Sequence, residues 1–382
     1  MKLICITHWR MPSEKTLSPY IMRVCEAFAR QGVEVELWAP RRFNPQFAGV
    51  DPFSYHLIEK IFRIKKIAVL DLMRFLPDRG GFFLMLVSFT LVLFFKVALM
   101  RDRERVVFYF HDIRDAWLSV LLSRKVFSEI LMYYKSSVDL INRWCFAKIK
   151  GFIFTTRSVM DQMRNDYGVD TGRMLYAPCA VNFARFGIAT SREEARAKLG
   201  LPENECIILY AGHLFSSKGV DTLLEAAPFL SKEGVIYFVG GTDEDIKSFK
   251  VKSEKLKVKN VIIAGRKGHE EIPLWLRAAD LLVIPNTARE DAAKYESSPS
   301  KLFEYMASGR PIVASDVPAI RDVFDESMGY FFEPDNVASL VAAIKQVLAD
   351  RRGAEEKGKR ARAEVRQYSW EARAASIKRF LE

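Results

Sequence analysis

Short runs of apolar residues alternate along the chain with longer segments in which apolar residues recur at helical spacing. The runs predict buried strands, and the segments with a period of 3.6 residues predict helices. In the first half, the expected strands are residues 2–7, 35–38, 106–110, 130–134 and 151–155, and the expected helices are 20–31, 82–100, 113–122 and 138–149. Regular alternation of strand and helix is typical of a parallel sheet covered by helices.

The same alternation begins again after residues 178–192, which we interpret as a linker. The expected strands of the second half are residues 206–210, 236–239, 261–263, 281–284 and 311–314, the expected helices are 220–229, 272–279 and 300–307, and residues 337–382 are expected to be helical. A chain of 382 residues has room for two α/β cores. We therefore predict two Rossmann-like domains, residues 1–188 and 189–364, and a C-terminal helix at 365–382 that crosses back to the first domain.

The composition is that of a globular protein, with 49% hydrophobic and 27% charged residues. Five cysteines are scattered without a Cys-x-x-Cys pair or metal-ligand spacing, which is typical of reduced thiols in a cytosol-like compartment. The first expected strand begins directly after Met1, so we expect no secretion signal. We therefore expect a cytoplasmic protein.

The net charge of +11 lies in the N-terminal half. Residues 1–190 contain 28 Lys and Arg against 17 Asp and Glu, whereas residues 191–382 contain 30 of each kind. This asymmetry predicts an anionic partner for the first half. No Arg/Gly-rich tract, zinc finger or aromatic RNA-binding strand accompanies the charge, so we exclude nucleic acid and expect an anionic membrane surface.

An apolar segment in the same half bears on this expectation. Residues 82–95 are apolar almost all round a helix, and Lys96 and a charged run at 101–105 follow them. The segment fits a core helix, a helix lying in the membrane interface, or a membrane-spanning helix. Lys96 and the strand expected at 106–110 argue against a span, and the first two alternatives stay open. We expect a peripheral protein on the inner face of the cytoplasmic membrane.

The strongest chemical signal is a pair of glutamates, Glu296 and Glu304, that are separated by seven residues around the start of an expected helix. Ser298, Ser300 and Lys301 lie between them, where the first backbone N–H groups of a helix have no partner. Such N–H groups and the positive end of the helix dipole bind phosphate or sugar hydroxyls. Taken alone, the segment also fits a capped amphipathic helix with two surface glutamates.

A second segment, residues 210–226, combines a strand, a loop with two glycines, and a helix. Gly212 allows a ligand to approach the backbone closely, and Lys218 supplies a positive charge suited to a diphosphate. Because it occurs together with the glutamate pair, we interpret Lys218 as a ligand-binding residue rather than a solvated loop lysine.

At these residues the C-terminal half resembles the family 4 retaining glycosyltransferases, which have a GT-B fold of two Rossmann-like domains with a cleft between them. The resemblance is strong in residues 205–330, above all in the stretch SPSKLFEYMASGRPIVASD at 298–316, and weak before residue 150. It implies that a sugar is transferred from a nucleoside-diphosphate sugar to a glycan or lipid-linked acceptor, in cell-surface polysaccharide or glycolipid synthesis. It also implies retention of configuration and no need for a metal or other cofactor.

The resemblance also implies roles for individual residues. Lys218 neutralises the donor diphosphate, Glu304 binds the ribose hydroxyls, and Glu296 binds the transferred sugar. The backbone amides of residues 298–301 hold the β-phosphate and the sugar, and the turn at 265–267 meets the base. The residues implied for the donor are Gly212, His213, Lys218, Gly265, Arg266, Lys267, Glu296, Ser298, Ser300, Lys301 and Glu304.

The sequence departs from the family pattern in two places. His213 stands where the family commonly has arginine, so diphosphate binding is expected to depend more on Lys218. The family's glycine-rich first loop is replaced by residues 9–19, in which Ser13, Thr16 and Ser18 are our candidates for binding the acceptor.

The N-domain histidine of many relatives has two candidate counterparts, His111 and Lys135, and both stay open. Only His111 matches the residue type, so we count it with Lys218 and Glu296 as catalytic and Lys135 as acceptor-binding. As an isolated histidine at the end of a strand, His111 also fits a structural role, and this alternative stays open. Two other functions remain as alternatives. One is a non-catalytic nucleotide-sugar-binding subunit, which His213 and the altered first loop favour, and the other is a nucleotide-sugar epimerase on the same fold.

Overall fold

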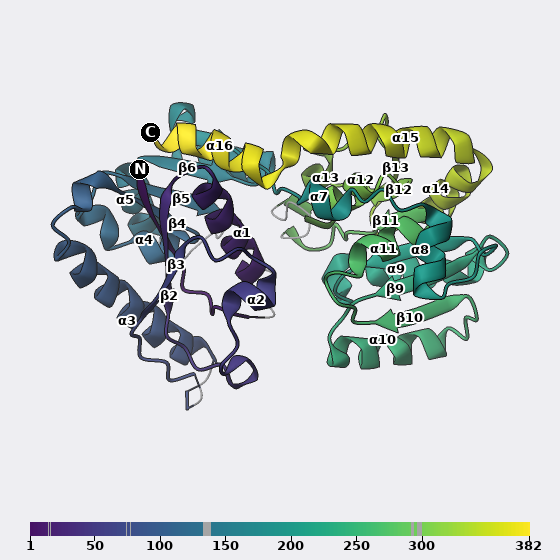
Figure 1. Ribbon diagram of the computed structural model, residues 1–382, viewed down its shortest axis with the longest axis horizontal. Coiled ribbons are helices and arrows are strands. Elements are labelled where there is room, and N and C mark those ends of the chain that lie inside the picture. The colour runs from purple at the N-terminus through teal and green to yellow at the C-terminus, as the bar shows by residue number, and fades with distance from the viewer. Residues whose placement is uncertain are drawn as a thin grey trace. The chain divides into compact units, whose positions relative to one another are not determined.

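The computed structural model describes residues 1–13, 15, 17–73, 75–76, 78–132, 139–291, 294–295 and 300–382 (Figure 1). The chain divides into two compact units. Unit 1 comprises Met1–Pro178 and Trp370–Glu382, and unit 2 comprises Cys179–Ser369. Unit 2 begins earlier than the domain start that we expected at residue 189, and the last helix of the chain is part of unit 1.

Unit 1 is built on a parallel sheet with the strand order β3-β2-β1-β4-β5-β6-β7. Its strands are β1 (Lys2–Ile6), β2 (Glu34–Pro40), β3 (Arg63–Ile67), β4 (Val106–Phe110), β5 (Val126–Ile130), β6 (Gly151–Phe154) and β7 (Met174–Tyr176). Its helices are α1 (Leu17–Arg30), α2 (Pro52–His56), α3 (Asp78–Ala98), α4 (Ile113–Ala116), α5 (Asp139–Lys148), α6 (Arg157–Tyr167) and α16 (Trp370–Leu381).

Both faces of this sheet are covered, which explains the continuous apolar runs of its central strands. Ile4 and Ile6 belong to a core cluster with side chains of α3, α5 and α6. The alternate residues face the opposite side, where the ring of Tyr109 lies 5.8 Å from that of Phe28 of α1. On that side the ring of Phe127 also lies 5.9 Å from that of Phe380 of α16. Figure 1 shows α3 on one side of the sheet and α1 on the other.

Unit 2 repeats the architecture with a parallel sheet of order β10-β9-β8-β11-β12-β13. Its strands are β8 (Ile207–Ala211), β9 (Val235–Val239), β10 (Val261–Gly265), β11 (Leu281–Ile284), β12 (Ile312–Ser315) and β13 (Tyr330–Phe332). Its helices are α7 (Phe183–Phe186), α8 (Arg192–Leu199), α9 (Val220–Ala226), α10 (Asp243–Lys255), α11 (Ile272–Ala278), α12 (Ser300–Ser308), α13 (Pro318–Arg321), α14 (Val337–Ala349) and α15 (Arg351–Glu364).

The predicted α/β class with two Rossmann-like parallel-sheet domains is confirmed, and so is the helical stretch at 337–382, but two expectations were wrong. The strand expected at 130–134 is β5, which ends at Ile130, and residues 133–134 lie outside the described residues. The helix expected at 113–122 is shorter, because only α4 and a 3₁₀ turn at Ser119–Leu121 form. The stretch at 337–382 is helical but is divided into α14, α15 and α16.

The strands β3, β7 and β13 were not expected. All three lie at an edge of their sheet and are five residues long or shorter. An edge strand has one neighbour only and tolerates polar side chains, so β3, with the sequence RIKKI, has no apolar run to reveal it.

Candidate functional site

The carboxyl ends of the unit 2 strands lie at one edge of the sheet, which is where parallel α/β sheets bind ligands. The strand order reverses direction between β8 and β11, so the loops after these two strands diverge and leave room for a ligand. Gly212, His213 and Lys218 lie in the loop after β8, and α12 follows β11. The two segments that the sequence analysis singled out therefore meet at this switch point.

Close packing at the switch point requires glycine. Gly212 has φ +149°, and a Cβ atom on it would lie 2.5 Å from Nζ of Lys301. Gly240, which follows β9 and has φ +119°, lies so close to Gly212 that a Cβ on it would overlap the Gly212 carbonyl oxygen. These positions allow the β8 loop, the β9 loop and α12 to touch.

Lys301 is held against the β8 loop. Its Nζ donates a hydrogen bond of 2.7 Å to the hydroxyl of Tyr210 and lies 4.0 Å from the centre of that ring. The Tyr210 hydroxyl in turn donates to the carbonyl of His213 over 2.7 Å. Burial, with the positive charge of Lys218 added to it, lowers the pKa of Lys301 to about 7.

Lys301, Lys218, His213 and Arg266 form what we call the basic cluster. Burial lowers the pKa of Lys218, and the charge of Glu290 opposes this shift. Burial also lowers the pKa of His213, followed by the charges of Lys301, Lys218 and Arg266, while Asp245 opposes them. Cationic groups with lowered pKa values regain their charge when an anion binds, so the cluster favours an anionic ligand.

The other predicted donor residues lie around this cluster. Ser300 is the first residue of α12, and Glu304 lies one turn further along the helix. The negative charge of Glu304 raises the pKa values of Lys301 and Arg185, but burial lowers both pKa values by more. Gly265 ends β10 with φ +73° and Lys267 Nζ lies 5.5 Å from the centre of the Trp275 ring. Glu296 and Ser298 lie outside the described residues, so their roles stay predictions.

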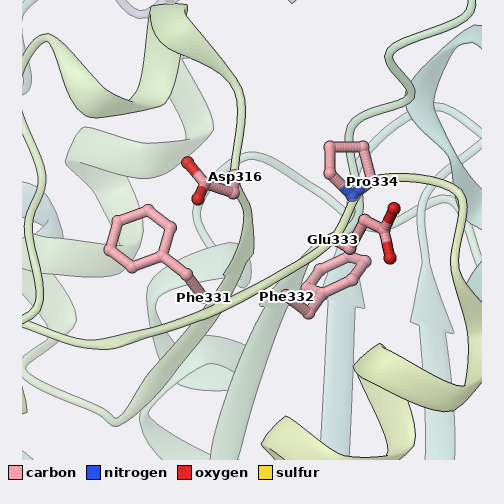
Figure 2. Close-up of a pocket in the computed structure, with 5 residues that line it drawn as sticks. All are labelled: Asp316, Phe331, Phe332, Glu333 and Pro334. Atoms are coloured by element: carbon pink, nitrogen blue, oxygen red, sulfur yellow. The ribbon is translucent and has the colours of Figure 1, made fainter.

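A hollow of about 370 Å³ lies at the same edge of the sheet, beyond the ends of β12 and β13. Figure 2 shows the residues that line it, Asp316, Phe331, Phe332, Glu333 and Pro334. Asp316 accepts hydrogen bonds of 2.6 and 2.9 Å from Arg321. Because its wall carries two carboxylates, this hollow is less suited to a diphosphate than the basic cluster is. Within the described ranges, His, Cys, Asp and Glu form no group of three that could hold a metal ion.

Unit 1 has a corresponding switch point between β1 and β4, and a histidine follows each of these strands. Nδ1 of His8 lies 2.9 Å from Oδ1 of Asp115, and Nδ1 of His111 lies 2.8 Å from Oε2 of Glu129. Both side chains are buried, and Nε2 of each has no hydrogen-bond partner among the described residues. His111 thus lies inside unit 1, which favours a structural role, and its catalytic role stays a prediction.

Glu129 is the centre of a buried polar network. Its carboxylate accepts hydrogen bonds from the hydroxyl of Tyr20, over 2.5 Å, and from the guanidinium of Arg373 on α16, and it also contacts His111. Burial raises the pKa of Glu129, but the charge of Arg373 and the contact with His111 outweigh it and lower the pKa to about 2. Burial likewise lowers the pKa of His111, yet the influence of the nearby Cys5 and the contact with Glu129 raise it to about 9.

Sequence reasoning missed His8, Asp115, Glu129 and Arg373. One signal was available for His8, because it follows the first strand as His111 follows the fourth, and ends of parallel strands share an edge. No sequence signal joined Glu129 to Arg373, since 244 positions separate them.

The candidates for acceptor binding divide into two groups. Ser13 and Ser18 are buried, and the Ser18 hydroxyl lies 2.8 Å from Nε2 of His56 while the Ser13 hydroxyl accepts from the Lys15 N–H. Both hydroxyls thus stabilise the first loop of unit 1. Thr16 and Lys135 lie outside the described residues. The acceptor roles of all four residues stay predictions.

Comparison with known proteins identifies the family. The family described as "Glycosyltransferase Family 4" matches residues 17–185, and the family described as "Glycosyl transferases group 1" matches residues 191–379. The D-inositol 3-phosphate glycosyltransferase of Xylanimonas cellulosilytica is 26% identical over 235 residues, which are 59% of this chain and 55% of that protein. The chain spans about half the length of the curated relatives it matches.

Solved structures show the same fold. The superposition on sucrose-phosphate synthase from Thermosynechococcus elongatus covers 99% of this chain and 97% of that protein, with a TM-score of 0.77 and 21% sequence identity. The superposition on Anabaena HepE in complex with UDP covers 100% of this chain and 99% of that protein, with a TM-score of 0.74 and 14% sequence identity. At these identities the likeness concerns the fold alone. The two family matches cover one half of the chain each, and the protein therefore belongs to the group 1, family 4 glycosyltransferases with a GT-B fold.

Proposed function

We propose that the protein is a retaining glycosyltransferase that moves a sugar from a nucleoside-diphosphate sugar to a glycan or lipid-linked acceptor, in the synthesis of a cell-surface polysaccharide or glycolipid. The observation that carries the proposal is the basic cluster at the switch point of unit 2. Two partly buried lysines with lowered pKa values interact there, and the negative charge of a diphosphate would stabilise the charged form of both.

The surroundings of the cluster suit the rest of such a donor. Glu304, one turn into α12, offers a carboxylate to the ribose hydroxyls, and the turn at Gly265, Arg266 and Lys267 offers backbone groups to the base. A solved relative, Anabaena HepE, was described in complexes with UDP and with UDP-glucose, which makes a uridine diphosphate sugar the first donor to test.

In the proposed reaction the bond between the sugar C1 and the diphosphate oxygen breaks, and a bond from C1 to the acceptor oxygen forms on the same face. The acceptor proton passes to the departing diphosphate, so atoms and charge balance without a nucleophile from the protein. Lys218 and Lys301 stabilise the negative charge that develops on the leaving group, and the fixed loops hold the donor in place. Because these cations serve the diphosphate, we propose that no metal is needed.

The acceptor is proposed to bind unit 1, which carries the excess positive charge. We place the protein in the cytoplasm, at the inner face of the cytoplasmic membrane, where lipid-linked acceptors are available.

A thermal-shift panel of nucleotides and nucleotide sugars, followed by transfer and donor-hydrolysis assays with and without EDTA, tests the proposal. A ligand that binds the folded state raises the melting temperature, so the panel identifies the donor. We expect a nucleoside-diphosphate sugar to stabilise the protein and to turn over equally with EDTA present. Strict metal dependence would contradict the metal-free mechanism, and binding without turnover would favour the non-catalytic alternative.

The pH dependence of donor binding tests the position of His213. Its lowered pKa leaves it neutral at pH 7, so donor affinity should rise as the pH falls below about 6.5 and the ring gains charge. Lys301, with a pKa of about 7, also gains charge as the pH falls through that value, so it adds a first increase in donor affinity near pH 7. His213→Arg supplies a permanent charge and should remove the rise at low pH while that of Lys301 remains. Donor Kd measured from pH 5 to 8 is the readout. An unchanged profile in the variant would show that His213 does not touch the donor and only stacks on the ring of Phe215, whose centre lies 4.9 Å from its own.

A further inference from the structure

The helix α3 has two apolar faces with different environments. Every fourth residue of one face, namely Met85, Phe89, Leu93 and Val97, is completely buried in the core of unit 1. The opposite face is exposed and equally apolar. We call this stripe the α3 outer face, and it consists of Phe83, Leu84, Val87, Leu91, Phe95 and, just after the helix, Leu99.

The exposure of the α3 outer face is large for apolar side chains. Phe83 is 62% exposed, Phe95 61% and Leu99 82%. The preceding segment extends the patch, because the backbone N–H of Leu70 donates to the hydroxyl of Ser88, which places Leu70, itself 60% exposed, against α3. Contiguous apolar surface of this kind marks a site of interaction with a protein or a membrane.

The charge around the patch identifies the partner. Residues 60–105 contain ten Lys and Arg against four Asp and Glu. Lys60, Arg63 and Lys65 are exposed on and before β3, the strand on which α3 packs, and Arg101 and Arg105 are exposed just after the helix. An apolar stripe flanked by exposed basic residues matches the interface of an anionic bilayer, where apolar side chains enter the acyl region and cations meet the headgroups.

We propose that the α3 outer face docks unit 1 on an anionic lipid surface, with α3 lying in the plane of the membrane. By length and composition, residues Gly80–Ala98 are also sufficient to cross a bilayer. The buried stripe decides against a span, because α3 can enter the membrane fully only if Met85, Phe89 and Leu93 leave the core of unit 1. The proposal specifies the surface behind the proposed membrane location but does not depend on transferase activity.

Flotation of the full-length protein with vesicles tests the proposal. We expect binding to vesicles that mix phosphatidylglycerol with phosphatidylcholine, weaker binding at high salt, and none to phosphatidylcholine alone. Replacing Phe83, Val87, Leu91 and Phe95 by serine should lower the partition coefficient at least about tenfold, since four exposed apolar side chains are lost. Leu86, although adjacent, is buried and is left unchanged so that the variant keeps its core.

The matched control replaces four exposed apolar residues elsewhere by serine, Leu121, Leu140, Phe229 and Val251. It should float as the wild type does, and both variants should unfold at the wild-type temperature. The proposal is overturned if the wild type stays at the bottom of the gradient with anionic vesicles at low salt, or if the α3 variant still floats. The wild type could instead fail to float and form a dimer, and the α3 variant could be monomeric. That result would overturn the proposal and assign the α3 outer face to a second copy of the chain. Donor hydrolysis by the α3 variant should equal that of the wild type, so a failure here is distinguishable from a failure of the proposed function.

Discussion

Lys218→Ala should lower kcat/KM for sugar transfer by about 10²-fold or more, the scale measured when one charge-stabilising donor is removed from an active site. That factor corresponds to about 2.7 kcal/mol of transition-state stabilisation. The loss is expected because Lys218 lies in a partly buried basic cluster, where in the proposed reaction its charge would act on the departing diphosphate with little screening. Steady-state kinetics with the donor found by the thermal-shift panel provide the measurement.

Two further variants make this result specific. Glu304→Ala should act mainly on nucleotide binding, so its effect should appear in the Kd for the nucleoside diphosphate more than in kcat. Lys232→Ala removes an exposed lysine of unit 2 and should leave both constants unchanged. Wild-type kcat/KM in the Lys218 variant would remove Lys218 from the site.

Glu129→Ala should destabilise unit 1 by about 3–5 kcal/mol, the usual cost of removing one partner from a buried charged network. The substitution leaves the Arg373 guanidinium and His111 buried without the carboxylate that compensates them. Because Arg373 belongs to α16, the attachment of this helix to unit 1 should weaken as well. Denaturant unfolding and amide hydrogen exchange of residues 370–382 measure the two effects.

The network also predicts how stability depends on pH. The lowered pKa of Glu129 contributes stability that is present above pH 4.5 and is lost as the pH falls toward about 2. The raised pKa of His111 contributes stability that is present below pH 6.5 and is lost as the pH rises through about 9.

Glu129→Gln keeps the size of the side chain but removes its charge, so it should reduce both losses of stability. Glu371→Gln, on the exposed surface of α16, is the matched control and should leave the profile unchanged. A Glu129→Gln profile identical to that of the wild type would show that the network does not titrate as described.

The amino-acid sequence alone predicted the α/β class, the two parallel sheets and most of their central strands. The reason is that strands buried on both faces are apolar runs, as in VVFYF of β4 and IILYA of β8. The same reasoning failed at β5, because VFSEI places Ser128 and Glu129 inside a strand that is nevertheless fully buried. The carboxylate is tolerated there only because Arg373, Tyr20 and His111 surround it, and none of these is near in sequence.

The candidate site shows the same division. Lys218 and the start of α12 were recognisable from sequence, since a glycine-containing loop after a strand and polar residues at a helix start are local features. The lowered pKa of Lys301 was not, because it depends on burial against Tyr210, 91 positions away, and on the neighbouring charge of Lys218.

For α3 the sequence determined only that an apolar helix forms, since a helix that is apolar almost all round has no periodicity to indicate a direction. Packing on the sheet supplied that direction by burying Met85, Phe89, Leu93 and Val97 and leaving the outer face exposed. Local patterns depend on neighbours along the chain and can be read from it. The burial of a charge and the choice of a face depend on contacts between residues far apart in sequence, and those exist only once the chain has folded.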